Sequence, residues 1–73
     1  DSEMMALTQW RESLKEILLL LEAGNLQAIE LTDALASKTP PFLRPQFDEL
    51  VVMVQSLDFS SAMPIGRELL RSA

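Results

Sequence analysis

The side chains that could do chemistry in this chain are mainly carboxylates, because its 73 residues include no histidine and no cysteine. Histidine is the commonest general base and metal ligand in proteins, and cysteine thiolates are nucleophiles and metal ligands. Two carboxylate pairs have helical spacing, Glu12 with Glu16 and Glu30 with Asp33. Metal-binding bundles of the di-iron type add a Glu-x-x-His motif to such pairs, and this sequence lacks one. We interpret both pairs as solvated acidic faces and expect no metal site.

Hydroxyl and phosphate chemistry also lack their usual sequence context. No serine lies in a Gly-x-Ser-x-Gly nucleophile elbow, and there is no histidine to activate a hydroxyl. The two glycines, Gly24 and Gly66, are too few for a phosphate-binding loop. We therefore expect no catalytic residues and no bound cofactor, and we interpret the chain as a non-enzyme.

The charge balance narrows the choice of partners. Six basic and eleven acidic side chains give a formal net charge of −5. Phosphate backbones and anionic lipid headgroups repel such a domain, so we expect neither nucleic acid nor a membrane surface as a partner. No stretch resembles a membrane span or a signal peptide, and the lack of cysteine gives no sign of an oxidising compartment, which favours a cytoplasmic location. Because the chain begins with Asp1, we expect a fragment of a longer protein.

The first predicted element is a helix that ends at about Ala23. Its apolar residues recur every three or four positions, which places them on one face: Leu7, Trp10, Leu14, Ile17, Leu18 and Leu21. Leu19 and Leu20 fall outside this stripe. We predict that they form a second apolar face, which is available to another molecule or to a second copy of the chain.

Helix-ending and helix-starting residues divide the rest of the chain. Gly24 suits the left-handed position that ends a helix, and Asn25 is a good N-cap for a second helix over about residues 26–37. Thr39 precedes a proline, which disfavours helix there, so a third helix begins between residues 42 and 45 and ends near 56 or 57. Asp58 caps a fourth helix, which we predict to be kinked or restarted between Met63 and Gly66, around Pro64.

The predicted architecture is a single all-α domain, an antiparallel up-and-down four-helix bundle over residues 1–73. Short connections of this kind place consecutive helices side by side in opposite directions. We expect the core to draw on all four helices. The apolar residues of the second helix are Leu26, Ile29, Leu31 and Leu35. We expect these residues of the last two helices to face inward: Phe47, Leu50, Val51, Val54, Phe59, Ala62, Met63, Leu69 and Leu70, with Val52 and Met53 broadening the stripe of the third helix.

Three stretches resemble histidine-containing phosphotransfer (HPt) domains. They are residues 20–28, which hold the first helix joint, residues 47–50, and residues 57–62, which read Leu-Asp-Phe-Ser-Ser-Ala. HPt domains are antiparallel four-helix bundles, and a helix of their core carries a His-x-Leu-Lys-Gly motif with an exposed histidine that is phosphorylated. Aligned on the leucine, residues 33–37 of this chain read Asp-Ala-Leu-Ala-Ser.

The resemblance implies an HPt-like module without phosphotransfer. Asp33 stands in place of the histidine, Ala36 in place of the lysine that assists the phosphate, and Ser37 in place of the glycine. A carboxylate without a metal or a nearby lysine has no evident way to accept a phosphoryl group. The resemblance therefore implies a docking domain of bacterial two-component signalling, which binds a receiver or kinase domain through a surface around Glu30, Asp33 and Ser37.

Two alternatives remain beside this interpretation. A plain helical oligomerisation or docking module, unrelated to phosphorelay, would use Leu19 and Leu20. The segment from Gln55 to Phe59 also resembles the Asp-Ser-Leu signature of acyl carrier proteins, in which the serine, here Ser56, begins a helix and carries phosphopantetheine. Gln55 replaces the aspartate, however, and too few residues follow Ser56 for the two helices that such a protein needs after its serine.

Overall fold

Four α-helices and one short 3₁₀ helix form the structure, a computed structural model that describes residues 2–72, and side chains from residue 6 to residue 72. The helices are α1 (Ser2–Ala23), α2 (Gln27–Ala36), α3 (Arg44–Gln55) and α4 (Phe59–Ser72), and the 3₁₀ helix η1 (Pro41–Leu43) leads into α3. The described residues contain no strand. These bounds confirm the four predicted helices, while η1 is an element that the sequence analysis did not predict.

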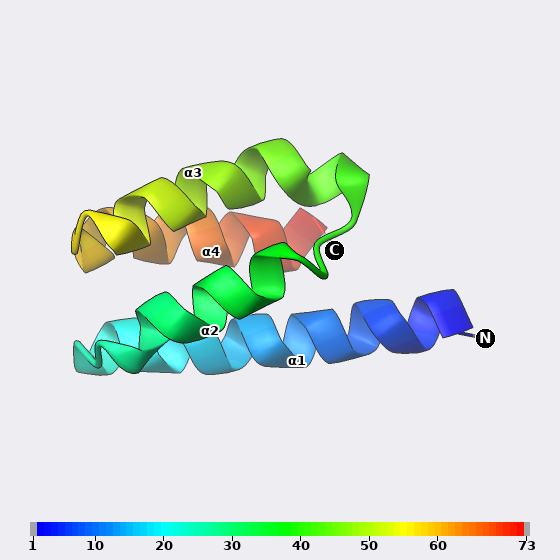
Figure 1. Cartoon of the computed structure of the whole chain (residues 1–73), viewed down its shortest axis with the longest axis horizontal. Coiled ribbons are helices and arrows are strands. Elements are labelled where there is room, and N and C mark those ends of the chain that lie inside the picture. Colours follow the sequence, from blue (N-terminus) through cyan, green and yellow to red (C-terminus); the bar gives the residue numbers. More distant parts are fainter. Residues whose placement is uncertain (1, 73) are drawn as a thin grey trace.

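The helices form a closed ring in which each lies antiparallel to the next (Figure 1). α1 packs against α2 and α4, and α3 packs against the same two helices, which confirms the up-and-down bundle. At 1.5 Å per residue, the 22 residues of α1 cover about 33 Å, close to the 35 Å length of the molecule. The shorter helices leave the N-terminal turns of α1 projecting beyond the bundle (Figure 1). Because consecutive helices are antiparallel, the α1–α2 and α3–α4 turns lie at the same end of the molecule (Figure 1).

The core runs along the axis of this ring. It confirms the predicted stripe of α1, in which Leu7 alone is only partly buried. The buried apolar residues are Trp10, Leu14, Ile17, Leu18, Leu21, Ala28, Leu35, Leu43, Phe47, Leu50, Val54, Ala62 and Leu69. Val52 is wrongly predicted to broaden the buried stripe, since it is more than half exposed, and two apolar residues of the second predicted helix, Leu26 and Leu31, are exposed as well. Val52 lies two residues from buried Leu50, about 200° around the helix, and therefore faces away from the core.

Trp10 joins α1 to the connection between α2 and α3. Its indole Nε1–H donates a hydrogen bond of 3.1 Å to the hydroxyl of Thr39, which in turn donates one of 2.9 Å to the carbonyl of Leu35. The ring of Trp10 also lies against that of Phe47, with centroids 6.2 Å apart and planes tilted by 54°. The side chain of Trp10 thus contacts both the α2–α3 connection and α3. Its indole N–H and the hydroxyl of Thr39 both have hydrogen-bond partners.

Gly24 and Asn25 make the α1–α2 turn as predicted. Gly24 has φ +71°, and the N–H of Asn25 donates to the carbonyl of Leu20 at 2.8 Å, which is the long hydrogen bond of a Schellman ending. The side chain of Asn25 then accepts a hydrogen bond of 2.9 Å from the N–H of Gln27. α2 is assigned from Gln27, but Leu26 already has helical angles (φ −66°, ψ −16°), so the capping side chain is that of Asn25, as predicted.

The α3–α4 turn repeats this geometry with a leucine in place of glycine. Leu57 has φ +63°, and the N–H of Asp58 donates to the carbonyl of Met53 at 2.9 Å. The carboxylate of Asp58 accepts a 3.3 Å hydrogen bond from the N–H of Ser61, which confirms its predicted role as the N-cap of α4. A left-handed conformation brings Cβ close to the backbone, so Leu57 is held at a position that favours glycine.

α4 is one continuous helix through Pro64, so of the two predicted forms, a kink or a restart, the restart is wrong and the kink stays a prediction. Proline removes one N–H from the helix ladder, and the residue that loses this donor, Ser60, is exposed. Gly66 is not a weak point either, because it is buried against α1. A Cβ at this position would overlap the Cδ2 atom of Leu18, so the missing side chain is what allows α4 to approach α1 closely.

A helix must be both long and apolar to cross a bilayer. In the part of the chain that the structure describes, none of the helices combines these two properties.

Candidate docking surfaces

The carboxylate pairs lie on the surface and form no cluster. Glu12 and Glu16 are exposed on α1, and Glu30 and Asp33 are exposed on α2. Among the described residues, no three acidic side chains lie close enough together to hold a metal ion. Among the described residues, the ion pairs join Arg44 to Asp48 on α3 and Arg71 to Glu68 on α4. Neither pair involves the carboxylates of α2.

The structure brings the three predicted residues of the second helix onto one outward face. Glu30, Asp33 and Ser37 are spaced by three and four residues, and all three are exposed. The hydroxyl of Ser37 donates a 2.9 Å hydrogen bond to the carbonyl of Ala34, so it helps to end α2. We call Glu30, Asp33 and Ser37 the α2 face. Its carboxylates stand on a rigid helix and point into solvent.

A shallow groove between α1 and α2 borders this face. Its lining includes Leu31, Ala34 and Lys38 from α2 and the following turn, and Ser13 and Glu16 from α1. Leu31 contributes apolar surface, while Lys38 and Glu16 contribute charges of opposite sign. The α2 face therefore has an apolar margin on the side of α1, which suits a protein partner better than a small polar ligand.

Leu19 and Leu20 point to different sides of α1, so they do not form the single face that the sequence analysis predicted. Leu19 is 66% exposed on the outward side. Leu20 is partly buried and packs against the core. The two side chains are separated by about 100° around the helix. Leu20 is spaced by seven and four residues from Ser13 and Glu16, which line the groove with α2, so it lies on the side of α1 that α2 covers. Of this predicted pair, Leu19 alone offers a largely exposed apolar surface.

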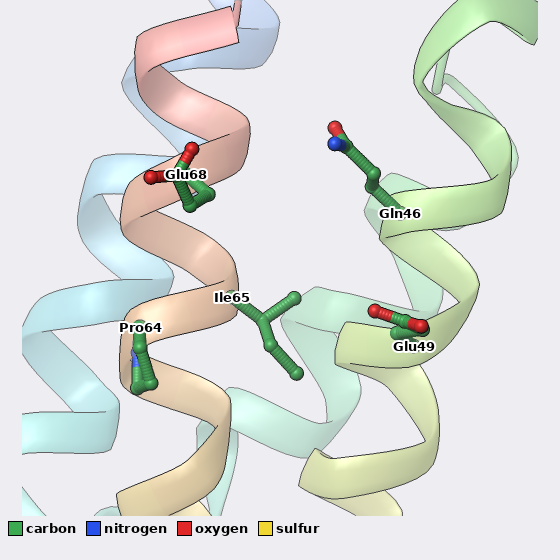
Figure 2. A pocket seen from close by; sticks show the side chains of 5 residues that line it. All are labelled: Gln46, Glu49, Pro64, Ile65 and Glu68. Carbon is green, nitrogen blue, oxygen red and sulfur yellow. The ribbon is translucent and has the colours of Figure 1, made fainter.

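A second groove, between α3 and α4, was missed by the sequence analysis. Ile65 extends from α4 toward α3, with Glu49 and Gln46 on the facing helix and Glu68 on α4 (Figure 2). The groove continues over Val52 and Met53, and the residues that line it are Pro45, Gln46, Asp48, Glu49, Val52, Met53, Pro64, Ile65 and Glu68. One feature of the sequence could have indicated this groove. Val52 is two residues from Leu50, a spacing that places Val52 away from the buried side of the helix.

Ser56 does not occupy the position that the acyl-carrier alternative needs. Its backbone N–H donates to the carbonyl of Val52 at 3.0 Å, so it closes the last turn of α3. The serine of that signature begins a helix, and here the following helix is capped by Asp58. The alternative therefore loses the structural feature on which it rested.

Comparison with known proteins adds no relative. No protein-family model, no curated protein and no solved structure gives a significant match to the chain.

Proposed function

We propose that this chain is a protein-docking module whose contact surface is the α2 face. The observation that carries the proposal is the exposure of Glu30, Asp33 and Ser37 on one side of a short helix, beside a groove with an apolar margin. Rigid elements present side chains to a partner with little loss of conformational entropy on binding. The residues of this face offer hydrogen-bond acceptors and negative charge, and they include no activated nucleophile.

The proposed partner is a receiver or kinase domain of a bacterial two-component system, bound without phosphotransfer. Support comes from the resemblance of the helix joints to HPt domains and from the antiparallel four-helix ring, the architecture of that family. Asp33 occupies the place of the phosphorylated histidine. Ala36, at the place of the assisting lysine, is partly buried and uncharged, and its carbonyl accepts a 2.7 Å hydrogen bond from Arg44.

Titration of the chain with receiver and kinase domains, followed by calorimetry, tests this proposal. We expect saturable binding, and we expect Asp33→Arg to weaken it by about tenfold or more because the substitution reverses a charge inside the contact surface. The matched control is Glu12→Arg, which makes the same charge change at an exposed position of α1. Glu12→Arg should leave the affinity within about twofold of the wild-type value, because it changes only the net charge of the chain.

The absence of chemistry is tested in the same mixtures. When the receiver domain carries a radiolabelled phosphoryl group, the chain should stay unlabelled, and label on Asp33 would overturn the proposal. Equal weakening by Asp33→Arg and Glu12→Arg would also overturn it, because binding would then depend on net charge and not on the α2 face.

A second candidate function is self-association through the outward side of α1, either alone or together with docking. The observation that favours it is the exposure of Leu19 among charged neighbours. Two copies that pair across a two-fold axis would bury this side chain on both protomers.

A further inference from the structure

The groove between α3 and α4 combines an apolar floor with a rim of one charge sign. Its floor is formed by Val52, Met53 and Ile65, of which Val52 is 56% exposed. Met53 and Ile65 are partly buried, so the floor is anchored to the core and keeps its shape. The part of the floor and rim on α3 extends over residues 45–53, which is about 12 Å at 1.5 Å per residue.

The rim is anionic. Three of the nine lining residues are carboxylates, Asp48, Glu49 and Glu68, and none is a lysine or an arginine. Arg44 lies 3.9 Å from Asp48 and Arg71 lies 3.5 Å from Glu68, and both pairs are solvent-exposed, so these two carboxylates have cations beside them that are not held tightly. Glu49, between the two stretches of the groove, takes part in neither pair. The groove between α1 and α2 differs, because it contains a lysine.

Shape and charge together select the occupant. A furrow between two packed helices, about two helical turns long, accepts the ridge of a third helix that presents apolar residues every three or four positions. The anionic rim favours lysine and arginine beside those residues, and the net charge of −5 attracts such a segment over a longer range. A second copy of this chain carries the same negative charge and is disfavoured at this site.

We propose that the α3–α4 groove binds a basic amphipathic helix of a partner protein. The apolar side of that helix packs on Val52 and Ile65, and its cations pair with Glu49 and Glu68. This surface lies across the ring from the groove between α1 and α2, and it does not share residues with the α2 face. The inference is therefore independent of the proposed receiver-docking function, and the chain has two separate surfaces for two partners.

A synthetic amphipathic peptide of leucine and lysine, about 14 residues or four helical turns long, is a suitable probe. Titration of the isotope-labelled chain with this peptide should shift amide resonances in residues 45–53 and 64–68 and should saturate at one peptide per chain. The same peptide with glutamate in place of lysine should not bind. Shifts confined to α2, equal binding of both peptides, or no binding of the lysine peptide would each overturn the proposal.

Matched charge reversals separate the groove from general attraction between opposite charges. Glu49→Lys should weaken binding of the lysine peptide by about tenfold, while Glu30→Lys, an equal change on α2, should change it by less than about twofold. Val52→Ser tests the apolar floor. Because Val52 is 56% exposed, the substitution should leave the fold intact, and we expect about fivefold weaker binding. If Glu49→Lys and Glu30→Lys weaken binding equally, the groove is not the site. Loss of receiver binding in Glu30→Lys with peptide binding kept would leave this inference standing.

Discussion

The hydroxyl of Thr39 accepts a hydrogen bond from the buried indole of Trp10 and donates one to Leu35. Thr39→Val should lower the free energy of unfolding by about 1–3 kcal/mol, because the indole N–H then loses its acceptor inside the protein. The carbonyl of Leu35 keeps a second donor, the N–H of Lys38 at 2.9 Å, and adds little to this cost. Urea unfolding followed by the fluorescence of Trp10, the single tryptophan, measures the change.

Thr39→Ser is the control for this prediction, since it keeps the hydroxyl and removes only a methyl group. It should cost clearly less than Thr39→Val. A larger loss in Thr39→Ser than in Thr39→Val would show that packing of the methyl group, which Thr39→Val keeps, and not the hydrogen bond makes Thr39 important.

Leu57 stands at a left-handed position that Gly24 fills in the matching turn. Leu57→Gly should raise the free energy of unfolding by about 0.5–1 kcal/mol, because glycine relieves the Cβ contact of this conformation and the leucine is 59% exposed. Leu57→Ala keeps Cβ and should change stability little. Gly24→Ala should be destabilising by a similar amount, since no atom lies near its Cβ and only the conformation opposes it. A loss of stability in Leu57→Gly would mean that the leucine side chain contributes packing after all.

Residue-scale features of this kind lie beyond local sequence patterns. Thr39 was interpreted only as a residue disfavoured in a helix before proline, and its partner Trp10 is 29 positions away. Leucine is not typical of a left-handed C-terminal position, so Leu57 gave no signal of the Schellman ending, whereas Gly24 did.

At the scale of elements, the sequence predicted helix type and ends well because capping chemistry is local. Asn25 and Asp58 each accept a backbone hydrogen bond at the start of the next helix, as their residue types suggested. Which side of a helix is covered by a neighbouring helix depends on the packing of the whole bundle, so the residues nearby in the sequence do not determine it. Leu20 is partly buried on the side of α1 that lines the groove with α2, whereas Val52 is exposed along the groove between α3 and α4.

The contact of α4 with α1 depends on Gly66 and Leu18. Gly66→Ala should lower the free energy of unfolding by about 1 kcal/mol, because overlap of the new Cβ with Leu18 outweighs the better helix propensity of alanine. In a Leu18→Val background, which lacks the overlapping Cδ2 atom, the same substitution should be neutral or stabilising. Thermal unfolding of the four proteins of this double-mutant cycle measures the coupling. Additive effects would contradict the close-approach role of Gly66.

At the scale of the whole molecule, the ring of helices separates three surfaces. The α2 face was predicted from the sequence because its residues share one helix, whereas the α3–α4 groove needs two helices whose contact sides the sequence does not specify. The remaining surface, the outward side of α1, was predicted only in part, since Leu20 belongs to the core.

Self-association through α1 predicts a concentration-dependent dimer that Leu19→Glu converts to monomer. Because Leu19 is exposed, the substitution should leave the free energy of unfolding of the monomer within about 0.5 kcal/mol. Light scattering over a range of concentrations measures the association. A wild-type chain that stays monomeric at every concentration would contradict this second candidate function. Leu20→Glu is not a usable probe, because it would place a charge against the core.

The most direct test of the docking function is an amide chemical-shift map of the chain with a phosphorylated receiver domain, followed by intact mass measurement. The account predicts shifts concentrated in residues 30–37 of α2 and the adjoining turn, with the mass of the chain unchanged. Shifts that avoid these residues, or a mass increase that corresponds to a phosphoryl group on Asp33, would contradict it.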